Sequence, residues 1–189
     1  MADLADLPEL TAAISTDLAG AAIPHAISGA IAMAAHGYIR STADLDILVV
    51  VPSLRLPQVF ELVRRHGFEG EDRALIASLR EQTVARLVRG PTFVEILVPV
   101  LPYHHGILAR AVVRPLRGRQ VPFVSIADLI VLKMLWHRVK DVADIHGLLA
   151  QPGATSDGDF IRRTLRSLIP ASDPRHAEIE SLLRTFGRD

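Results

Sequence analysis

The sequence predicts an α+β fold, in which a small mixed sheet with flanking helices precedes a helical C-terminal region. Three observations predict this class. β-Rich segments at 44–51, 82–89 and 92–98 alternate with segments of helical periodicity. From residue 125 onward only helical patterns occur. Hydrophobic residues make up 49% and charged residues 22% of the 189 residues, which is the balance of a folded globular chain.

The N-terminal third is expected to alternate helices and strands. A first helix is predicted over 4–18, because Leu7, Leu10 and Ile14 recur at helical spacing. The elements that follow, in order, are a short strand at 24–28, a helix of small residues at 29–35, a strand at 44–51 and a helix at 56–66. A glycine or proline follows each of the last three, as expected where an element ends.

The middle of the chain predicts a hairpin and a basic segment. The segments 82–89 and 92–98 are joined by Gly90 and Pro91, so we expect two antiparallel strands. Residues 110–119 carry four arginines and no acid, ahead of a possible strand at 121–124. This basic segment either attracts nucleotide or RNA phosphates or is a solvated edge, and the second reading is the simpler one.

The C-terminal third predicts helices and one boundary. Ser125 and Asp128 have the spacing of a capping box, so a helix begins after Ser125. Further helices are expected at 141–149, 160–169 and 174–186. Pro and Gly concentrate in 151–159. We therefore expect a core domain over 1–150 and a C-terminal helical extension over 151–189.

Composition excludes several classes of protein. The 21 basic and 21 acidic residues balance, which argues against a non-specific nucleic-acid coat. The chain has no cysteine, so disulfide frameworks and thiolate metal sites are excluded. Its apolar runs are far shorter than a membrane helix requires, and the acidic N-terminus lacks the positive region of a signal peptide. We expect a cytoplasmic protein with no membrane partner.

The most informative segment is the strand that begins at Asp44. Asp44 and Asp46 are two residues apart, so both carboxylates point to the same face. Like charges this close need a cation, and Mg²⁺ prefers such oxygen ligands. Glu95 lies within another apolar strand, where an ionised side chain is costly unless paired or coordinated. Three acids on adjacent strands are what metal-assisted phosphoryl or nucleotidyl transfer needs.

A metal-free reading of the same acids stays open. Asp44 can cap the strand, and Glu95 can pair with an arginine such as Arg86 across the hairpin. The acids would then be structural parts of an α/β scaffold. The two readings differ in one respect, which is whether Glu95 lies beside Asp44 and Asp46.

Residues upstream of the acids suit phosphate binding. Gly29 lies at a strand-to-helix junction, where a glycine lets the backbone approach phosphate oxygens and a helix begins with unpaired N–H groups. Arg40 can neutralise phosphate charge, and Thr42 can bond to phosphate or to the backbone.

At these residues the chain resembles the polymerase-beta-like nucleotidyltransferase superfamily. Gly29-Ala30 is followed by thirteen residues and then Asp44-Leu45-Asp46-Ile47. The segment Arg40–Asp46 resembles the Arg-x-Thr-x-Asp-x-Asp variant of bacterial nucleotidyltransferases related to abortive-infection toxins of type IV toxin–antitoxin systems. Leu129–Lys133 and Arg138–Asp144 resemble a later pattern of these relatives, so the likeness covers about 24–150.

The resemblance implies a Mg²⁺-dependent transferase that moves a nucleoside monophosphate from an NTP, such as ATP, to a hydroxyl acceptor. The acceptor would be a tRNA, a protein side chain or a small molecule, and an antitoxin protein is a possible partner. Asp44, Asp46 and Glu95 would hold the metal, with Glu95 the candidate general base. The nucleotide-binding residues would be Gly29, Ala30, Arg40, Thr42, Lys133 and Asp141.

The chain departs from the family pattern at the phosphate loop. Ala30 stands where the family has Gly or Ser, and Ser28 stands where a hydrophobic residue is usual. The alternative is therefore a catalytically degenerate nucleotidyltransferase-fold binding module.

For several other residues, an ordinary structural role is expected or is the alternative to a functional one. Lys133, one of two lysines, is either a phosphate contact or a snorkelling side chain at a helix edge. Asp141 and Asp144, taken alone, predict a solvated helix face. His104 and His105 are expected in a turn, and Trp136 in the core.

Overall fold

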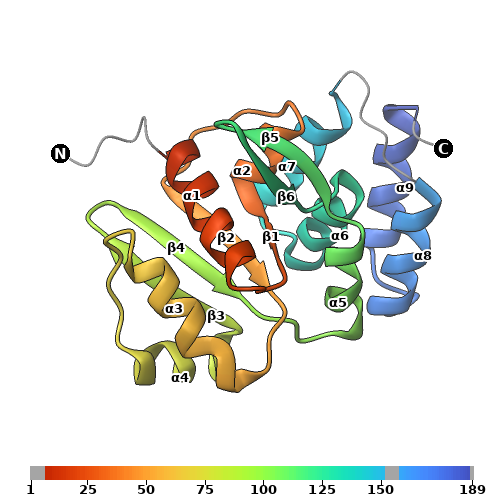
Figure 1. Cartoon of the computed structure of the whole chain (residues 1–189). Helices are drawn as coiled ribbons and strands as arrows, with labels where there is room; N and C mark the ends of the chain where they lie inside the picture. Colours follow the sequence, from red (N-terminus) through yellow and green to blue (C-terminus); the bar gives the residue numbers. More distant parts are fainter. Residues whose placement is uncertain (1–6, 152–157, 188–189) are drawn as a thin grey trace. The chain divides into compact units, whose positions relative to one another are not determined.

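The computed structural model describes residues 7–151 and 158–187 (Figure 1). The elements of the first part of the chain are α1 (Leu7–Gly20), β1 (His25–Ile27), α2 (Gly29–Ala35), β2 (Asp44–Val49), the 3-10 helix η2 (Ser53–Arg55), α3 (Leu56–Arg64), α4 (Asp72–Gln82), β3 (Val84–Arg89) and β4 (Thr92–Leu97). Then follow α5 (Pro102–Ala109), β5 (Val112–Leu116), β6 (Arg119–Phe123), α6 (Ile126–Trp136), α7 (Val139–Leu149), α8 (Gly158–Leu168) and α9 (Arg175–Thr185).

The described strands form one six-stranded mixed sheet in the order β3-β4-β2-β1-β6-β5. β2 runs parallel to β4, and β1 runs parallel to β6. The pairs β1/β2, β3/β4 and β5/β6 are antiparallel. The predicted α+β class, the mixed sheet and the hairpin at 82–98 are thereby confirmed.

One face of this sheet is buried under helices. Figure 1 shows α1 and α3 lying over it, and α1 contacts β1, β6 and α3. Leu45 and Ile47 of β2 and Val94 and Ile96 of β4 point to this face and are completely buried. Because side chains alternate along a strand, the residues between them project from the opposite face.

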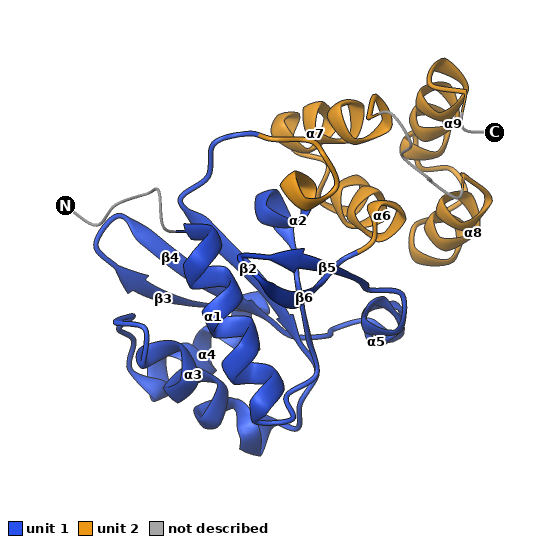
Figure 2. Cartoon of the chain, turned by 45° about the horizontal axis from the view of Figure 1, so that its top comes forward, with its two compact units in different colours: residues 1–32, 40–124 blue, residues 33–39, 125–189 orange. Residues whose placement is uncertain are grey.

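The chain forms two compact units (Figure 2). Unit 1 contains the sheet and holds the residues up to 32 and 40–124. Unit 2 holds 33–39 and the residues from 125 on, and in it α6 packs on α7 and α8, and α8 on α9. The helical C-terminal region thus includes α6 and α7. The domain boundary after residue 150 stays a prediction, and most of the expected linker, 152–157, lies outside the described residues.

Several expectations for individual elements need correction. His104 and His105 lie in a helix, α5, and not in a turn, because Pro102 begins a helical turn. α4 was not foreseen, although Glu71 caps it by accepting hydrogen bonds from the N–H groups of Arg73 and Ala74. β5 was not foreseen either. It pairs with β6.

Two further points concern the chain as a whole. The first helix is confirmed from Leu7, since the residues before it lie outside the description. In the part of the chain that the structure describes, no helix has the length and apolar character needed to cross a membrane.

Candidate functional site

The structure brings the three predicted acids together on one face of the sheet. β2 and β4 are neighbours, and in their register Asp46 lies opposite Glu95, while Asp44 lies opposite Phe93. Neighbouring strands are about 4.8 Å apart, so the side chains of Asp46 and Glu95 rise side by side. All three acids are partly exposed. Glu95 therefore lies beside Asp44 and Asp46, as the metal-binding interpretation requires.

Gly29 lies directly against this row of acids. It joins β1 to α2 with φ at +57°, a conformation that L residues other than glycine rarely adopt. A Cβ at this position would overlap the Oδ2 atom of Asp46. The N–H of Ser28 donates to the carbonyl of Asp46 at 2.8 Å, which draws the two segments together. Position 29 therefore requires glycine for both its backbone angle and its close approach.

Arg86 of β3 extends the row of acids to the edge strand of the sheet. It lies opposite Glu95 in the register of the hairpin, and its Nε donates to Glu95 Oε1 at 3.0 Å. Its Nη2 donates to the same oxygen, and the guanidinium lies 4.6 Å from the ring centre of Phe93. The Arg86–Glu95 pair considered as an alternative is thus confirmed. The hydrogen bond to Glu95 and its charge raise the pKa of Arg86, with smaller contributions from Asp44 and Asp46.

The other predicted nucleotide-binding residues of unit 1 precede the acids in sequence. The hydroxyl of Thr42 accepts from the N–H of Asp44 at 3.1 Å, so it organises the start of β2. Arg40 is partly buried and donates to the carbonyl of Ser41 at 3.3 Å. Ala30 is 3% exposed at the first turn of α2.

The donor set suits Mg²⁺ in its chemistry. The acids offer hard carboxylate oxygens, the absent Cβ of Gly29 makes space for the carboxylate of Asp46 itself, and Oε2 of Glu95 accepts no hydrogen bond from the described residues. Within residues 7–151 and 158–187, however, no three His, Asp or Glu side chains already surround a single point as metal ligands. A metal ion bound here would have to bring the carboxylates of the three acids closer together.

Lys133 and Asp141 belong to unit 2, where they form a buried ionic cluster. Lys133 Nζ lies 2.5 Å from Asp144 Oδ2 and 3.3 Å from Asp141 Oδ1. Arg138 Nε donates to Asp141 Oδ2 at 2.6 Å. Burial raises the pKa of Asp141, but hydrogen bonds from Arg138 and the charge of Lys133 outweigh it, and the net shift is downward. A phosphate contact by Lys133 stays a prediction.

This cluster shows that two of the expected structural roles are wrong. The side chains of Asp141 and Asp144 are 0% and 3% exposed, so they do not form a solvated face. Lys133 does not snorkel, since its side chain is 8% exposed and its ammonium group is paired. Trp136, expected in the core, is 53% exposed and stacks with Arg138.

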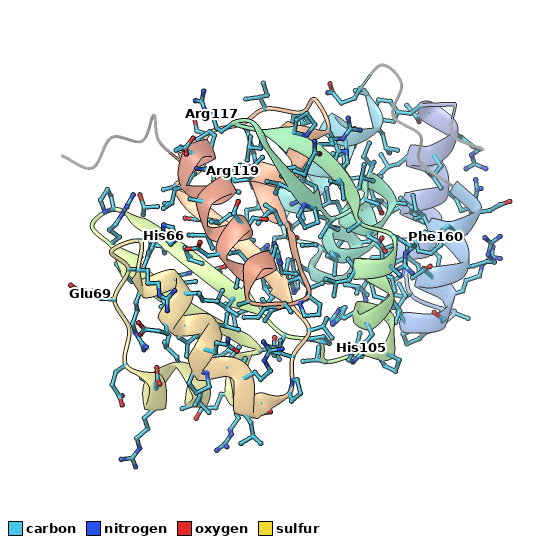
Figure 3. All side chains as sticks on the ribbon, in the orientation of Figure 1. His66, Glu69, His105, Arg117, Arg119 and Phe160 are labelled. Atoms are coloured by element: carbon cyan, nitrogen blue, oxygen red, sulfur yellow. The ribbon has the colours of Figure 1, made fainter. Side chains whose placement is uncertain are left out.

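Sequence reasoning missed two histidine contacts in unit 1. His66, labelled in Figure 3, pairs with Asp17 at 2.9 Å. His25 is buried between Ser15, whose hydroxyl is 2.8 Å from Nε2, and the carbonyl of Ile23, 2.9 Å from Nδ1. Burial lowers the pKa of His25, so the ring is neutral and Nδ1–H donates to that carbonyl. Both contacts join elements of the fold rather than face the acids.

A cavity of about 230 Å³ lies beyond the C-terminal ends of β2 and β4. It is lined by residues that follow β2 and β4, including Val50, Val51 and Val98, and by Leu79 of α4. Asp44 begins β2, so this cavity and the acid row lie toward opposite ends of the strand. The acids therefore occupy a sheet face and not this cavity.

No protein-family model matches the chain, and no curated protein matches it significantly in sequence. Solved structures do match. The solution structure of the antibiotic-resistance factor ANT(2'')-Ia is 16% identical, with 98% of this chain and 93% of that chain covered and a TM-score of 0.55. A nucleotidyltransferase-like antigenic protein from Paracoccidioides brasiliensis is 18% identical, with coverages of 95% and 93% and the same TM-score of 0.55.

The chain has a nucleotidyltransferase fold. A third match, the crystal structure of ANT(2'')-Ia in complex with adenylyl-2''-tobramycin, is 15% identical, covers 95% of this chain and 96% of that chain and has a TM-score of 0.51. At these identities the likeness concerns the fold. The chemistry has to be argued from the acid row itself.

Proposed function

We propose that the protein is a Mg²⁺-dependent nucleotidyltransferase that moves a nucleoside monophosphate from an NTP to a hydroxyl acceptor. One observation carries this proposal. Asp46 and Glu95 are register partners on adjacent parallel strands, and Asp44 shares their face. Gly29 accommodates the carboxylate of Asp46 where any other residue would place its Cβ, and the chain has a nucleotidyltransferase fold.

The reaction forms one bond and breaks another. The acceptor oxygen bonds to the α-phosphorus, the bond from that phosphorus to the bridging oxygen breaks, and pyrophosphate leaves. The acceptor proton passes to a carboxylate, for which Glu95 Oε2 is the candidate. Mg²⁺, when bound, would neutralise the triphosphate and polarise its oxygens. Asp44 and Asp46 would hold it, and Gly29 and Thr42 position those two aspartates.

The acceptor is proposed to be a small hydroxylated molecule. The support is a related fold, since ANT(2'')-Ia was solved with an adenylylated tobramycin. The same complex supports ATP as the donor. A tRNA or protein acceptor, a toxin role with an antitoxin partner and a cytoplasmic location rest on the sequence resemblance and composition alone.

A second candidate is a degenerate binding module that holds nucleotide without transferring it. Two observations favour it. Ala30 offers no hydroxyl at the first turn of α2. Arg86 occupies one oxygen of Glu95, the predicted general base. A module of this kind would bind Mg-NTP through Asp44 and Asp46 without turnover.

Calorimetry tests the first proposal. Mg-ATP is titrated into the wild type, Asp46→Asn and Asp159→Asn, the last being a matched control on α8 whose side chain is 73% exposed. We expect Mg²⁺-dependent binding in the wild type and control and a loss of about tenfold or more in Asp46→Asn. Equal binding in all three proteins, with and without Mg²⁺, would overturn the proposal. Transfer of labelled AMP to any acceptor would exclude the binding-module alternative.

A further inference from the structure

An arginine is built into the row of acids. Asp46 on β2, Glu95 on β4 and Arg86 on β3 occupy matching positions on three adjacent strands. Their side chains therefore rise from one face in a single line, with Arg86 at the edge of the sheet. Glu95 lies between a cation on one side and an aspartate on the other.

The position of the guanidinium is set by two residues of β4. Glu95 Oε1 accepts hydrogen bonds from both Nε and Nη2, so both donors converge on one oxygen. The ring of Phe93, two residues earlier on the same strand, lies against the cation. The side chain of Arg86 is 55% exposed, so this contact brings little stability and can rearrange at small cost.

The charges of this arrangement have opposite effects on two ligands. A bare divalent cation placed among the acids meets a positive charge already held on Glu95, and the two cations repel. A metal bound to a triphosphate brings several negative charges with it, which attract the same guanidinium. Arg86 therefore penalises the metal alone and favours the metal–nucleotide complex.

We propose that Arg86 is a specificity-determining residue that makes the acid row select a divalent cation carried by a nucleoside triphosphate over the cation alone. The proposal rests on the proposed function, since it assumes that the acids accept a metal. In the absence of nucleotide, the guanidinium of Arg86 forms an ion pair with the carboxylate of Glu95. When nucleotide arrives, the guanidinium can exchange a carboxylate oxygen for a phosphate oxygen, because both are anionic acceptors with similar geometry.

The test measures binding and not activity. Mg²⁺ alone and Mg-ATP are titrated separately into the wild type, Arg86→Gln and Arg86→Lys. Arg73→Gln is the matched control, because Arg73 is an exposed arginine in the first turn of α4 and is not part of the acid row. It removes the same net charge without altering the acid row.

We expect Arg86→Gln to bind Mg²⁺ alone about tenfold more tightly, and its preference for Mg-ATP over Mg²⁺ to fall by about tenfold or more. Arg86→Lys keeps the charge, so its preference stays within about threefold of the wild type. Arg73→Gln is expected to match the wild type. Circular dichroism of each variant confirms that the sheet is intact.

Three outcomes overturn the inference, and they are distinguishable. If the wild type binds Mg-ATP in a Mg²⁺-dependent way, but Arg86→Gln binds Mg²⁺ no more tightly, Arg86 does not select the ligand and the proposed function survives. If the wild type binds neither Mg²⁺ nor Mg-ATP, both the inference and the proposed function fail. Equal shifts in Arg86→Gln and Arg73→Gln would assign the effect to net charge, which also overturns the inference.

Discussion

Gly29 approaches Asp46 so closely that the carboxylate occupies the space where any other residue would have its Cβ. This relationship links the two halves of the sequence pattern, which are separated by the thirteen residues 31–43. The glycine that begins α2 and the acid on β2 are therefore coupled, and a change at either residue displaces the other.

Replacement of Gly29 by Ala is expected to impair both stability and ligand binding. The positive φ costs about 1–2 kcal/mol for a residue with a Cβ. The new methyl group also forces the Asp46 carboxylate out of line with Glu95. We expect Mg-ATP affinity, measured by calorimetry, to fall by about tenfold or more.

Gly90 provides the matched control. It has the same φ of +57°, but a Cβ at this position would have no heavy atom within 4 Å. Gly90→Ala should therefore show the backbone cost in urea unfolding without any change in Mg-ATP affinity. An equal loss of affinity in both variants would show that backbone strain, and not displacement of Asp46, is responsible.

Replacement of Lys133 by Met should destabilise the helical unit. The substitution leaves Asp144 and Asp141 buried without their shared ammonium group. Loss of one partner from a buried ionic cluster costs about 3–5 kcal/mol. Urea unfolding measures this cost. Lys140→Met is the control, because Lys140 is the other lysine of the chain and is exposed on α7.

The same pair of variants bears on the predicted phosphate contact. At urea concentrations where it is still folded, Lys133→Met should retain Mg-ATP affinity if the lysine acts only within the cluster. A selective loss of affinity in the folded variant, with Lys140→Met unchanged, would assign Lys133 a role in nucleotide binding as well.

Stability should fall as the pH is lowered through the range in which a free histidine becomes protonated. Burial lowers the pKa of His25 from its ordinary value of 6.5, so the unfolded chain binds a proton that the native protein does not. The contribution is fully present above pH 6.5 and is lost as the pH falls below that value, toward the lowered native pKa. NMR titration of the ring and urea unfolding between pH 8 and about pH 5 measure it.

His25→Gln should flatten the slope of unfolding free energy against pH in addition to lowering stability. An unchanged slope in His25→Gln would mean that other groups account for the pH dependence.

The acid row could be predicted from local pattern because it depends on alternation along single strands. The positions of Asp44 and Asp46 require only a period of two, and the hairpin turn places Arg86 opposite Glu95. The parallel pairing of β2 with β4 brings strands together across the intervening helices, and no local signal specifies it. α4 escaped prediction because it is largely polar and buries only Leu75 and Leu79.

The ionic cluster of unit 2 illustrates the same limit. The spacing of Asp141 and Asp144 predicts a shared helix face but not which way that face points. Packing of α7 on α6 decides the matter, because it directs both carboxylates toward Lys133. Trp136 shows the converse, since the helix end leaves an apolar residue exposed where periodicity predicts the core.

Gly147 gives a prediction in which the usual sign is reversed. Ala in place of Gly within a helix normally stabilises by about 0.5–1 kcal/mol. Here a Cβ on Gly147 of α7 would overlap the ring of Tyr38, which belongs to the same unit. Gly147→Ala is therefore expected to lower the melting temperature. The double variant Tyr38→Ser/Gly147→Ala should be more stable than Tyr38→Ser alone, because the added methyl group then meets no ring. If Gly147→Ala raised the melting temperature in the presence of Tyr38, the close contact between the ring and α7 would be refuted.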